Sequence, residues 1–357
     1  MNLAPKLNLT PKQSVILNRW EPVVLLVFAL TTQYIAAQPS DSRQNATEEL
    51  KRFEASKKAM GVKFSLVVYA KTVEQAKGGM GKVFKRIGEL DKMMSDYDPE
   101  SELMKLCRTL KPGAPEKVSC DLMAVLLLSQ KISRLSDGGF DPTIGPLSKL
   151  WRLARSTHQI PDPQRIQQAL SRVNWMNVVL NPKDQTVMFK RAGIQLDLGG
   201  IAKGYAADQA IQCFRDYQLP ICLVNASGDV TLGDPPPGKK GWTVAISTTE
   251  GQKLIIAKGS VASSGDHYQF LEHQGKRYSH IIDPKTGWGL TSRRLVTVVS
   301  KDPLPGTTAD ALASAMSVMP IKKIQQLANQ FKGCSVRIQA INAGPETEIL
   351  FQSGDFK

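Results

Sequence analysis

The segment TTADALASAM, residues 307–316, pairs a carboxylate with a hydroxyl at helical spacing. Asp310 and Ser314 lie four residues apart, so in a helix they project from one face with small side chains between them. Thr307 or Thr308 is placed to cap such a helix. Mg²⁺ is often held by one or two hard protein oxygens while substrate phosphates and water complete its octahedron. The spacing allows a magnesium site, although spacing alone is better explained by an acid stabilising a helix start beside a packed serine.

The segment LDLGGIAKGYAAD, residues 196–208, combines two glycines with a lysine at an expected helix start. Gly199 and Gly200 come just before a helix that opens near Ile201, where backbone N–H groups and the positive end of the helix dipole favour an anion. Lys203 adds a full positive charge in the first turn. Such a start can hold a pyrophosphate, and it can equally be a glycine turn into an ordinary helix with a solvated lysine.

A histidine supplies the candidate base. His280, in the segment SHIIDPKTG at residues 279–287, has the side chain best matched to proton transfer near neutral pH, and Asp283 begins the turn that follows it. His267, His273 and His280 follow one another at spacings of 6 and 7 residues, which match no pairing expected of a compact zinc site. A surface or hydrogen-bonded histidine is the plain alternative for each of the three.

A fourth segment, SDGGFDPTIGPLSKLW at residues 136–151, offers an aromatic ring next to an acid. Phe140 can cover a planar ring and Asp141 can accept hydrogen bonds from one. Core packing and capping explain these two residues about as well.

The hydrophobic pattern around these segments predicts helices and strands in mixed order. Helices are expected at about 73–95, 121–136, 146–156, 163–172, from 201, 308–318 and 320–331. Strands are expected at 63–70, in a hairpin at 178–189, at about 221–225, 242–247, 253–257 and 294–300, and as two terminal strands. Because strand pairs do not alternate strictly with helices, the order favours an α+β fold with helices packed on antiparallel sheets.

Composition narrows the class of protein. The 357 residues include 46 Lys+Arg against 32 Asp+Glu, a formal charge of +14 that indicates an anionic partner such as nucleic acid, a membrane surface or a phosphorylated small molecule. Dispersed lysines and only 6% aromatic residues disfavour nucleic acid. The P-loop, G-x-G-x-x-G and H-E-x-x-H motifs are all missing, which disfavours P-loop NTPases, Rossmann dehydrogenases and zincins. Five cysteines without a C-x-x-C pair indicate small buried side chains, not a zinc or disulfide scaffold.

The amino terminus resembles an export signal. Three basic residues before position 20 precede an uncharged apolar stretch at 23–30 and small residues at Ala36 and Ala37. The apolar stretch is shorter than the roughly 20 residues of a membrane-spanning helix, so the pattern predicts a signal peptide over 1–37, with an uncleaved anchor as the alternative. We therefore expect a polar tether at 38–58, one domain at 59–357, and a location outside the cytoplasm.

Eight motifs, taken together and in order, resemble the ApbE family, the FAD:protein FMN transferases. They are MGVKF (60–64), SDYDPESEL (95–103), GGFDPTIGPL (138–147), LDLGGIAKGYAAD (196–208), VNASGDV (224–230), SSGDHY (263–268), HIIDPKTG (280–287) and ADALASA (309–315). The resemblance runs from about Met60 to the end of the chain. It departs from the usual family pattern at Ser227, where a second glycine is usual, and at Ser263 and Ser314, where threonine is usual.

The resemblance implies a single compact α+β domain related to the T-fold, with FAD as substrate and Mg²⁺ as cofactor. It implies transfer of FMN from FAD to a Thr or Ser hydroxyl of a target flavoprotein through a phosphodiester, with release of AMP. Because members of the family are often exported and act on membrane redox proteins, it implies such an acceptor and a periplasmic or membrane-anchored location, with possible contact to a membrane surface. The alternatives are an Mg²⁺-dependent FAD pyrophosphatase and a non-catalytic FAD-binding protein.

The resemblance also assigns site residues. Flavin-dinucleotide contacts are implied for Met60, Tyr97, Gly139, Phe140, Asp141, Asp197, Lys203 and Ile282. The metal ligands are implied to be Asp310, Ser314 and the backbone carbonyl of Gly200. His280 is expected to take the proton of the attacking hydroxyl, and Asp283 to orient His280.

Overall fold

A large antiparallel sheet organises the described part of the chain. The computed structural model describes residues 49–246, 251–265, 269–341 and 348–356, so the predicted signal at 1–37 lies outside it. The sheet has eight strands in the order β1-β2-β6-β7-β10-β13-β14-β15, and every neighbouring pair is antiparallel. These strands are β1 (Lys51–Ala59), β2 (Val62–Ala70), β6 (Cys222–Ala226), β7 (Asp229–Leu232), β10 (Gly259–Ser264), β13 (Arg294–Ser300), β14 (Cys334–Ala340) and β15 (Glu348–Gln352).

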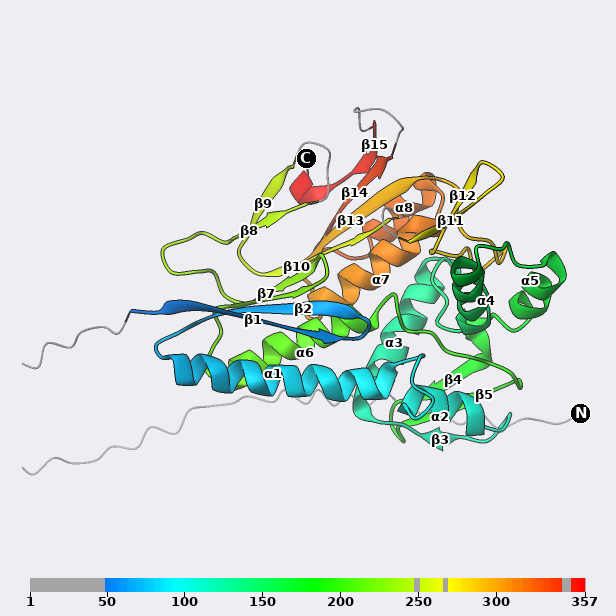
Figure 1. Ribbon diagram of the computed structural model, residues 1–357, viewed down its shortest axis with the longest axis horizontal. Helices are drawn as coiled ribbons and strands as arrows, with labels where there is room; N and C mark the ends of the chain where they lie inside the picture. The colour runs from blue at the N-terminus through cyan, green and yellow to red at the C-terminus, as the bar shows by residue number, and fades with distance from the viewer. Residues whose placement is uncertain (1–48, 247–250, 266–268, 342–347, 357) are drawn as a thin grey trace, which may run out of the picture. The chain divides into compact units, whose positions relative to one another are not determined.

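Helices cover one face of this sheet. Figure 1 shows α1 (Val73–Met94), α6 (Ala202–Asp216) and α7 (Pro305–Val318) on the same side of it, with α3 (Cys120–Leu135) against α7. Side chains alternate along a strand, so Leu66 and Val68 of β2 enter the helix-covered core while Val67 joins a smaller apolar cluster. The hairpin of β8 (Trp242–Ala245) and β9 (Lys253–Ile256) contributes to that second cluster. The predicted α+β class is confirmed.

The remaining elements surround this core. The other described helices are α2 (Glu102–Thr109), α4 (Gly145–Thr157), α5 (Pro163–Leu170), α8 (Ile321–Ala328) and two single 3₁₀ turns (Trp175–Asn177, Gly354–Phe356). The small strands are β3 (Glu116–Lys117), β4 (Val178–Asn181), β5 (Thr186–Phe189), β11 (Phe270–His273) and β12 (Lys276–Ser279). A helix that is long and apolar enough to cross a bilayer does not occur within the described ranges.

The expected tether is wrong over its second half. Residues 51–58 were assigned to a polar tether, but they form most of β1, which pairs with β2 along its whole length. Phe53 and Ala55 pack against the core while Glu54 between them faces solvent, so this strand has the mostly polar sequence that is typical of a linker. The sequence also missed α2 and several short strands.

A close crossing joins α6 to α7. A Cβ added to Gly204 would lie 2.1 Å from the carbonyl oxygen of Gly306, so the two helices meet through positions without side chains. Each helix supplies an acid that binds the first turn of the other. Asp208 of α6 accepts the N–H groups of Gly306 and Thr307, both at 2.8 Å, and Asp310 of α7 accepts the N–H of Gly204 at 3.1 Å. First-turn N–H groups have no partner within their own helix, so this exchange fixes both helix starts.

The exchange corrects the predicted cap of α7. That helix begins at Pro305, and its N-cap residue, Leu304, makes no side-chain cap bond. Thr307 therefore lies inside the first turn and donates its hydroxyl to Asp208 at 2.6 Å. The capping group comes from a distant part of the sequence, which local spacing could not indicate.

Candidate active site

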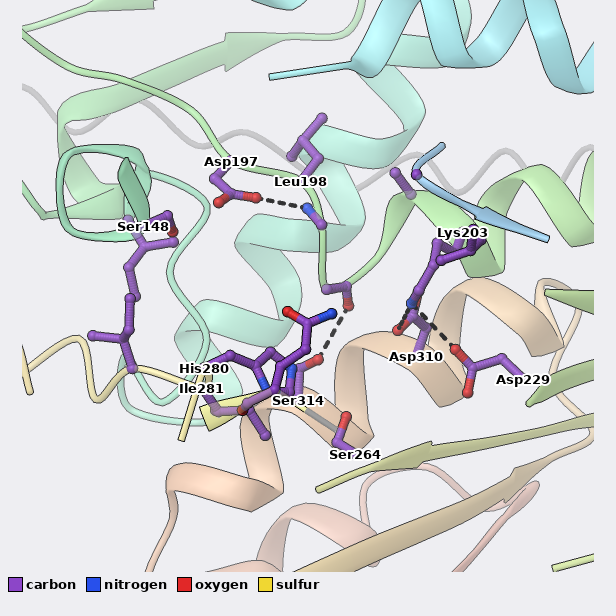
Figure 2. A pocket seen from close by; sticks show the side chains of 18 of the residues that line it. Ser148, Asp197, Leu198, Lys203, Asp229, Ser264, His280, Ile281, Asp310 and Ser314 are labelled. Carbon is purple, nitrogen blue, oxygen red and sulfur yellow. Dashed lines mark hydrogen bonds and ion pairs between the residues drawn. The ribbon is translucent and has the colours of Figure 1, made fainter. Parts of the chain in front are cut away.

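One cavity of about 1150 Å³ gathers the predicted site residues from segments far apart in the sequence. Twelve of the thirteen residues assigned from the sequence line it, and Figure 2 shows part of its wall. They are Met60, Tyr97, Gly139, Phe140, Asp141, Asp197, Gly200, Lys203, His280, Ile282, Asp310 and Ser314. Asp283 is the one that is absent from the lining.

The carboxylate, hydroxyl and carbonyl assigned to a metal lie close together. Asp310 is nearly fully buried, Ser314 follows it by one helical turn on α7, and the Ser314 hydroxyl lies 3.5 Å from the carbonyl oxygen of Gly200. A Cβ on Gly200 would lie 2.8 Å from the Ser314 hydroxyl and 3.3 Å from the ring of Phe140. Glycine at position 200 therefore allows the loop before α6 to approach α7 at this point.

Lys203 connects two acids at the same end of the cavity, as Figure 2 shows. Its Nζ lies 3.1 Å from Asp310 Oδ1, 3.2 Å from Asp310 Oδ2 and 3.1 Å from Asp229 Oδ2. Burial alone would lower the pKa of Lys203, but the two carboxylates raise it above its ordinary value, so the side chain stays a cation. Burial raises the pKa of Asp310, and Lys203 opposes that rise. The alternative of a solvated lysine is wrong.

The imidazole of His280 is oriented by a main-chain carbonyl. Gln269 O accepts the backbone N–H of His280 at 3.0 Å and lies 3.1 Å from His280 Nδ1. A carbonyl oxygen can only accept, so Nδ1 carries the hydrogen, and in the neutral ring Nε2 is the nitrogen that accepts a proton. This tautomer suits a general base.

Asp283 does not have the orienting role expected for it. Its carboxylate accepts the N–H of Lys285 at 2.8 Å and so closes the turn after His280, away from the cavity lining. Gln269 O makes the contact that the sequence assigned to Asp283. Asx turns of this kind are common where Asp begins a tight turn, which explains the residue type at this position.

The opposite end of the cavity is built around Arg152 of α4. Its guanidinium donates to Asp197 at 2.9 Å, pairs with Asp96, and lies 4.2 Å from the centre of the Tyr97 ring. The Tyr97 side chain is 74% exposed. Burial and the neighbouring Asp197 raise the pKa of Asp96. Asp197 also accepts the N–H of Gly199 at 2.8 Å, so that N–H is not a bare anion donor.

Phe140 and Asp141 also line the cavity. Phe140 is 7% exposed. The Asp141 carboxylate accepts the N–H and hydroxyl of Thr143 at 2.8 and 2.6 Å and the N–H of Trp175 at 2.9 Å. Burial raises the pKa of Asp141. These three bonds support the capping alternative for Asp141, and a contact with flavin stays a prediction.

Two hairpin turns with positive φ also reach the cavity. Met60 and Gly61, between β1 and β2, have φ of 50° and 72°, and Ser227 and Gly228, between β6 and β7, have φ of 56° and 111°. The left-handed region favours glycine, which accounts for the family's second glycine where this chain has Ser227. The N–H of Met60 is held by the carboxylate of Asp91 at 2.8 Å.

Three cavity residues were missed by the sequence argument. Asp229 lies inside a quoted motif but was given no role, and Asp96 and Arg152 were not singled out. The positions Ser148, Arg152 and Arg155 recur at helical spacing along α4, so a search for polar faces on that helix would have found them.

A multi-residue metal cage is not indicated. Within the residues that the structure describes, no group of three or more His, Cys, Asp or Glu side chains could hold an ion. His267 lies outside those residues, and His273 belongs to β11. The five cysteines are free thiols, but the expectation that they are buried holds only for Cys222.

Comparisons with known proteins agree with this geometry. The ApbE family model matches residues 60–338. A FAD:protein FMN transferase of Klebsiella pneumoniae is 32% identical over 66% of this chain and 75% of its own, and one of Treponema pallidum is 29% identical over 85% and 88%. The crystal structure of the ApbE protein of Thermotoga maritima superposes with a TM-score of 0.73 at 29% identity, covering 84% of this chain and 97% of that one.

Proposed function

The chain belongs to the ApbE family and is an FAD:protein FMN transferase, and we propose that it transfers FMN with the help of Mg²⁺ to a Thr or Ser hydroxyl of an acceptor flavoprotein. The observation that carries the proposal is the convergence of Asp310, Ser314 and Gly200 O with Lys203 and His280 in one cavity. The products are the phosphodiester-linked FMN-protein and AMP.

The residues at the Asp310 end fit Mg²⁺. A carboxylate, a hydroxyl and a carbonyl are all hard oxygen donors, and they are few enough to leave positions for substrate phosphates and water. When bound there, Mg²⁺ would neutralise charge on the diphosphate and on the departing AMP. Position 200 requires glycine, because a side chain there would clash with Ser314.

Lys203 and the start of α6 provide the second electrostatic contribution. Lys203 is a half-buried cation in the first turn of α6, a position at which the helix dipole also favours a negative group. We infer that these groups bind the diphosphate of FAD and hold it in line with the incoming hydroxyl. Positioning and charge stabilisation account for most of the rate in phosphoryl transfer, so a cation held beside the diphosphate is well suited to this site.

His280 moves the proton. With Nδ1 donating to Gln269 O, Nε2 can accept the proton of the acceptor hydroxyl as that oxygen attacks the FMN phosphorus. The bond from this phosphorus to the oxygen of AMP then breaks, and AMP leaves. If water takes the acceptor's place, the same residues hydrolyse FAD to FMN and AMP.

The cavity also offers places for two ring systems. Phe140 lines its wall, and Tyr97 with Arg152 and Asp197 forms the far end. We propose that Met60, Tyr97, Gly139, Phe140, Asp141, Asp197 and Ile282 contact the flavin and adenine parts of FAD. Aromatic faces and single polar groups are typical of nucleotide-ring recognition.

We further propose that the protein acts outside the cytoplasm on a membrane redox protein. Support comes from the basic, apolar, small-residue order of positions 1–37 and from the net charge of +14, which favours an anionic membrane surface. Mass analysis of the amino terminus from a cell-envelope fraction tests this: a chain starting near Gln38 supports cleavage, and a full-length chain in the cytosol contradicts export.

The central test measures both products. The purified chain is incubated with FAD, Mg²⁺ and a candidate acceptor, and the intact mass of the acceptor and the AMP released are recorded. Transfer predicts one FMN added per AMP formed. Free FMN with AMP and an unmodified acceptor would indicate a pyrophosphatase, and tightly bound FAD without AMP would indicate a binding protein. Addition of EDTA is expected to stop the reaction.

A further inference from the structure

Lys203 lies between two acids that have other anchors. Its Nζ is 3.1 and 3.2 Å from the two oxygens of Asp310 and 3.1 Å from Asp229 Oδ2. Asp310 also accepts the N–H of Gly204 at 3.1 Å, and Asp229 also accepts the N–H of Ser263 at 3.0 Å. Both carboxylates are therefore fixed by the main chain, while Lys203 has a flexible four-carbon stem. Lys203 is the member of the trio that can move.

Lys203 occupies the carboxylate of Asp310 that a bound divalent cation would also need. The side chains of Asp310 and Asp229 are only 5% and 15% exposed, so removal of every nearby cation would leave two carboxylates poorly solvated. The ammonium now contacts both oxygens of Asp310, where a divalent cation would also bind. Two cations on the same carboxylate repel each other strongly in a buried site.

We propose that Lys203 is the counter-ion of Asp310 in the metal-free protein, and that Asp229 retains Lys203 when a divalent cation takes Asp310. The inference rests on the proposed function only in taking Asp310 as the cation ligand. Lys203 then leaves Asp310 but stays at the site, which keeps a positive charge beside the substrate diphosphate. Asp229 is thus a positioning residue that acts through Lys203.

The proposal predicts opposite effects for two substitutions. Lys203→Met removes the competing cation, so Mg²⁺ without FAD binds about tenfold tighter, and the metal-free protein melts at a lower temperature. Asp229→Asn keeps an oxygen for the N–H of Ser263 but gives Lys203 no alternative acid, so Mg²⁺ binds about tenfold more weakly. Both affinities are measured by titration calorimetry, with melting temperatures recorded with and without Mg²⁺.

The double variant Lys203→Met with Asp229→Asn distinguishes two ways in which Asp229 could affect Mg²⁺ binding. Asp229 could hold Lys203 in place, or its negative charge could attract the metal directly. If Asp229 acts through Lys203, Asp229→Asn has a much smaller effect on Mg²⁺ affinity in the Lys203→Met background than in the wild type. An equal effect in both backgrounds would overturn the retaining role. Lys301→Met is the matched control, because Lys301 pairs with Asp355 at 2.8 Å on an exposed part of the surface and should leave Mg²⁺ affinity unchanged.

Three further results would contradict or support the proposed role of Lys203. Weaker Mg²⁺ binding by Lys203→Met, or no heat from either this variant or the wild type, contradicts the proposal. If Lys203→Met does not fold, Lys203→Gln takes its place. A crystal structure with Mg²⁺ is expected to keep the Lys203–Asp229 contact and lose the Lys203–Asp310 contact, and the reverse would refute it. These binding constants do not depend on turnover, so a failure of FMN transfer is distinguished from a failure of this inference.

Discussion

The two ends of the cavity are built in different ways. At one end, Asp310, Lys203 and Gly200 lie on or beside two helices that pack on the large sheet, and a hydrogen bond from the main chain holds Asp310 in place. At the other end, Tyr97 is 74% exposed and belongs to the segment after α1, where Arg152 reaches over it. The difference indicates that the first end is organised for chemistry and the second for recognition of the substrate. Substitutions at the first end should therefore lower the rate of transfer, and substitutions at the second end should weaken the affinity for FAD.

The largest effect is expected for Asp310→Ala. The variant loses the only carboxylate of the proposed metal set, and turnover with Mg²⁺ should fall by about four orders of magnitude. AMP release under saturating FAD is the measurement, and FAD binding followed by flavin fluorescence is its control. Unchanged turnover would remove Asp310 from the metal site.

His280→Ala is expected to come next. The variant removes the proton acceptor, so transfer should slow by about 10³-fold. His280 is only one of many residues that line the cavity, so FAD binding should stay near normal. Single-turnover rates on bound FAD give the chemical step directly. Asp283→Asn is the paired comparison, because its carboxylate closes a turn outside the cavity, and it should retain most of the rate. Loss of FAD binding with intact chemistry would contradict this role for His280.

Gly204→Ala tests the crossing that supports the chemical end. The new methyl group would lie 2.1 Å from the carbonyl oxygen of Gly306, which forces the helices apart and should cost about 3 kcal/mol of unfolding free energy. Urea denaturation measures it. Gly88→Ala on α1 is the control, because a Cβ at that position meets no atom within 4 Å and should not destabilise the protein. Equal stability of the two variants would show that the crossing tolerates a side chain.

The smallest effect is expected at the recognition end. Arg152→Leu removes the group that lies over Tyr97 and binds Asp197, so the KM for FAD should rise about tenfold with little change in kcat. Steady-state AMP release over a range of FAD concentrations checks it. A fall in kcat at unchanged KM would contradict the proposed division between the two ends.

The sequence predicted the parts of this molecule whose pattern is local. The helix that carries Asp310 and Ser314 and the helix start with Lys203 follow from periodicity and glycine position, and both are present. The meeting of Asp310 with Lys203 across 107 positions could not be read from spacing, because it depends on how two helices cross on a sheet. The resemblance to a family assigned Lys203 to FAD and Asp310 to the metal, but it did not predict the contact between them.

The errors have a shared physical cause. Thr307 was read as a cap because capping residues are usually neighbours in sequence, but Asp208 supplies the cap from another helix. Asp283 is expected to orient His280, but the carbonyl of Gln269 lies 3.1 Å from His280 Nδ1, and the Asp283 carboxylate binds the N–H of Lys285. In both cases a tertiary contact replaced a local one of the same chemistry.

The reciprocal capping of α6 and α7 has a consequence for dynamics. The amides of Gly204, Gly306 and Thr307 each depend on a carboxylate from the opposite helix, so neither helix can fray at its start without releasing the other. These amides should therefore exchange with deuterium together, as one cooperative opening unit. A molecule in which that unit has opened has no assembled catalytic end, so it should be inactive until the two helices close again.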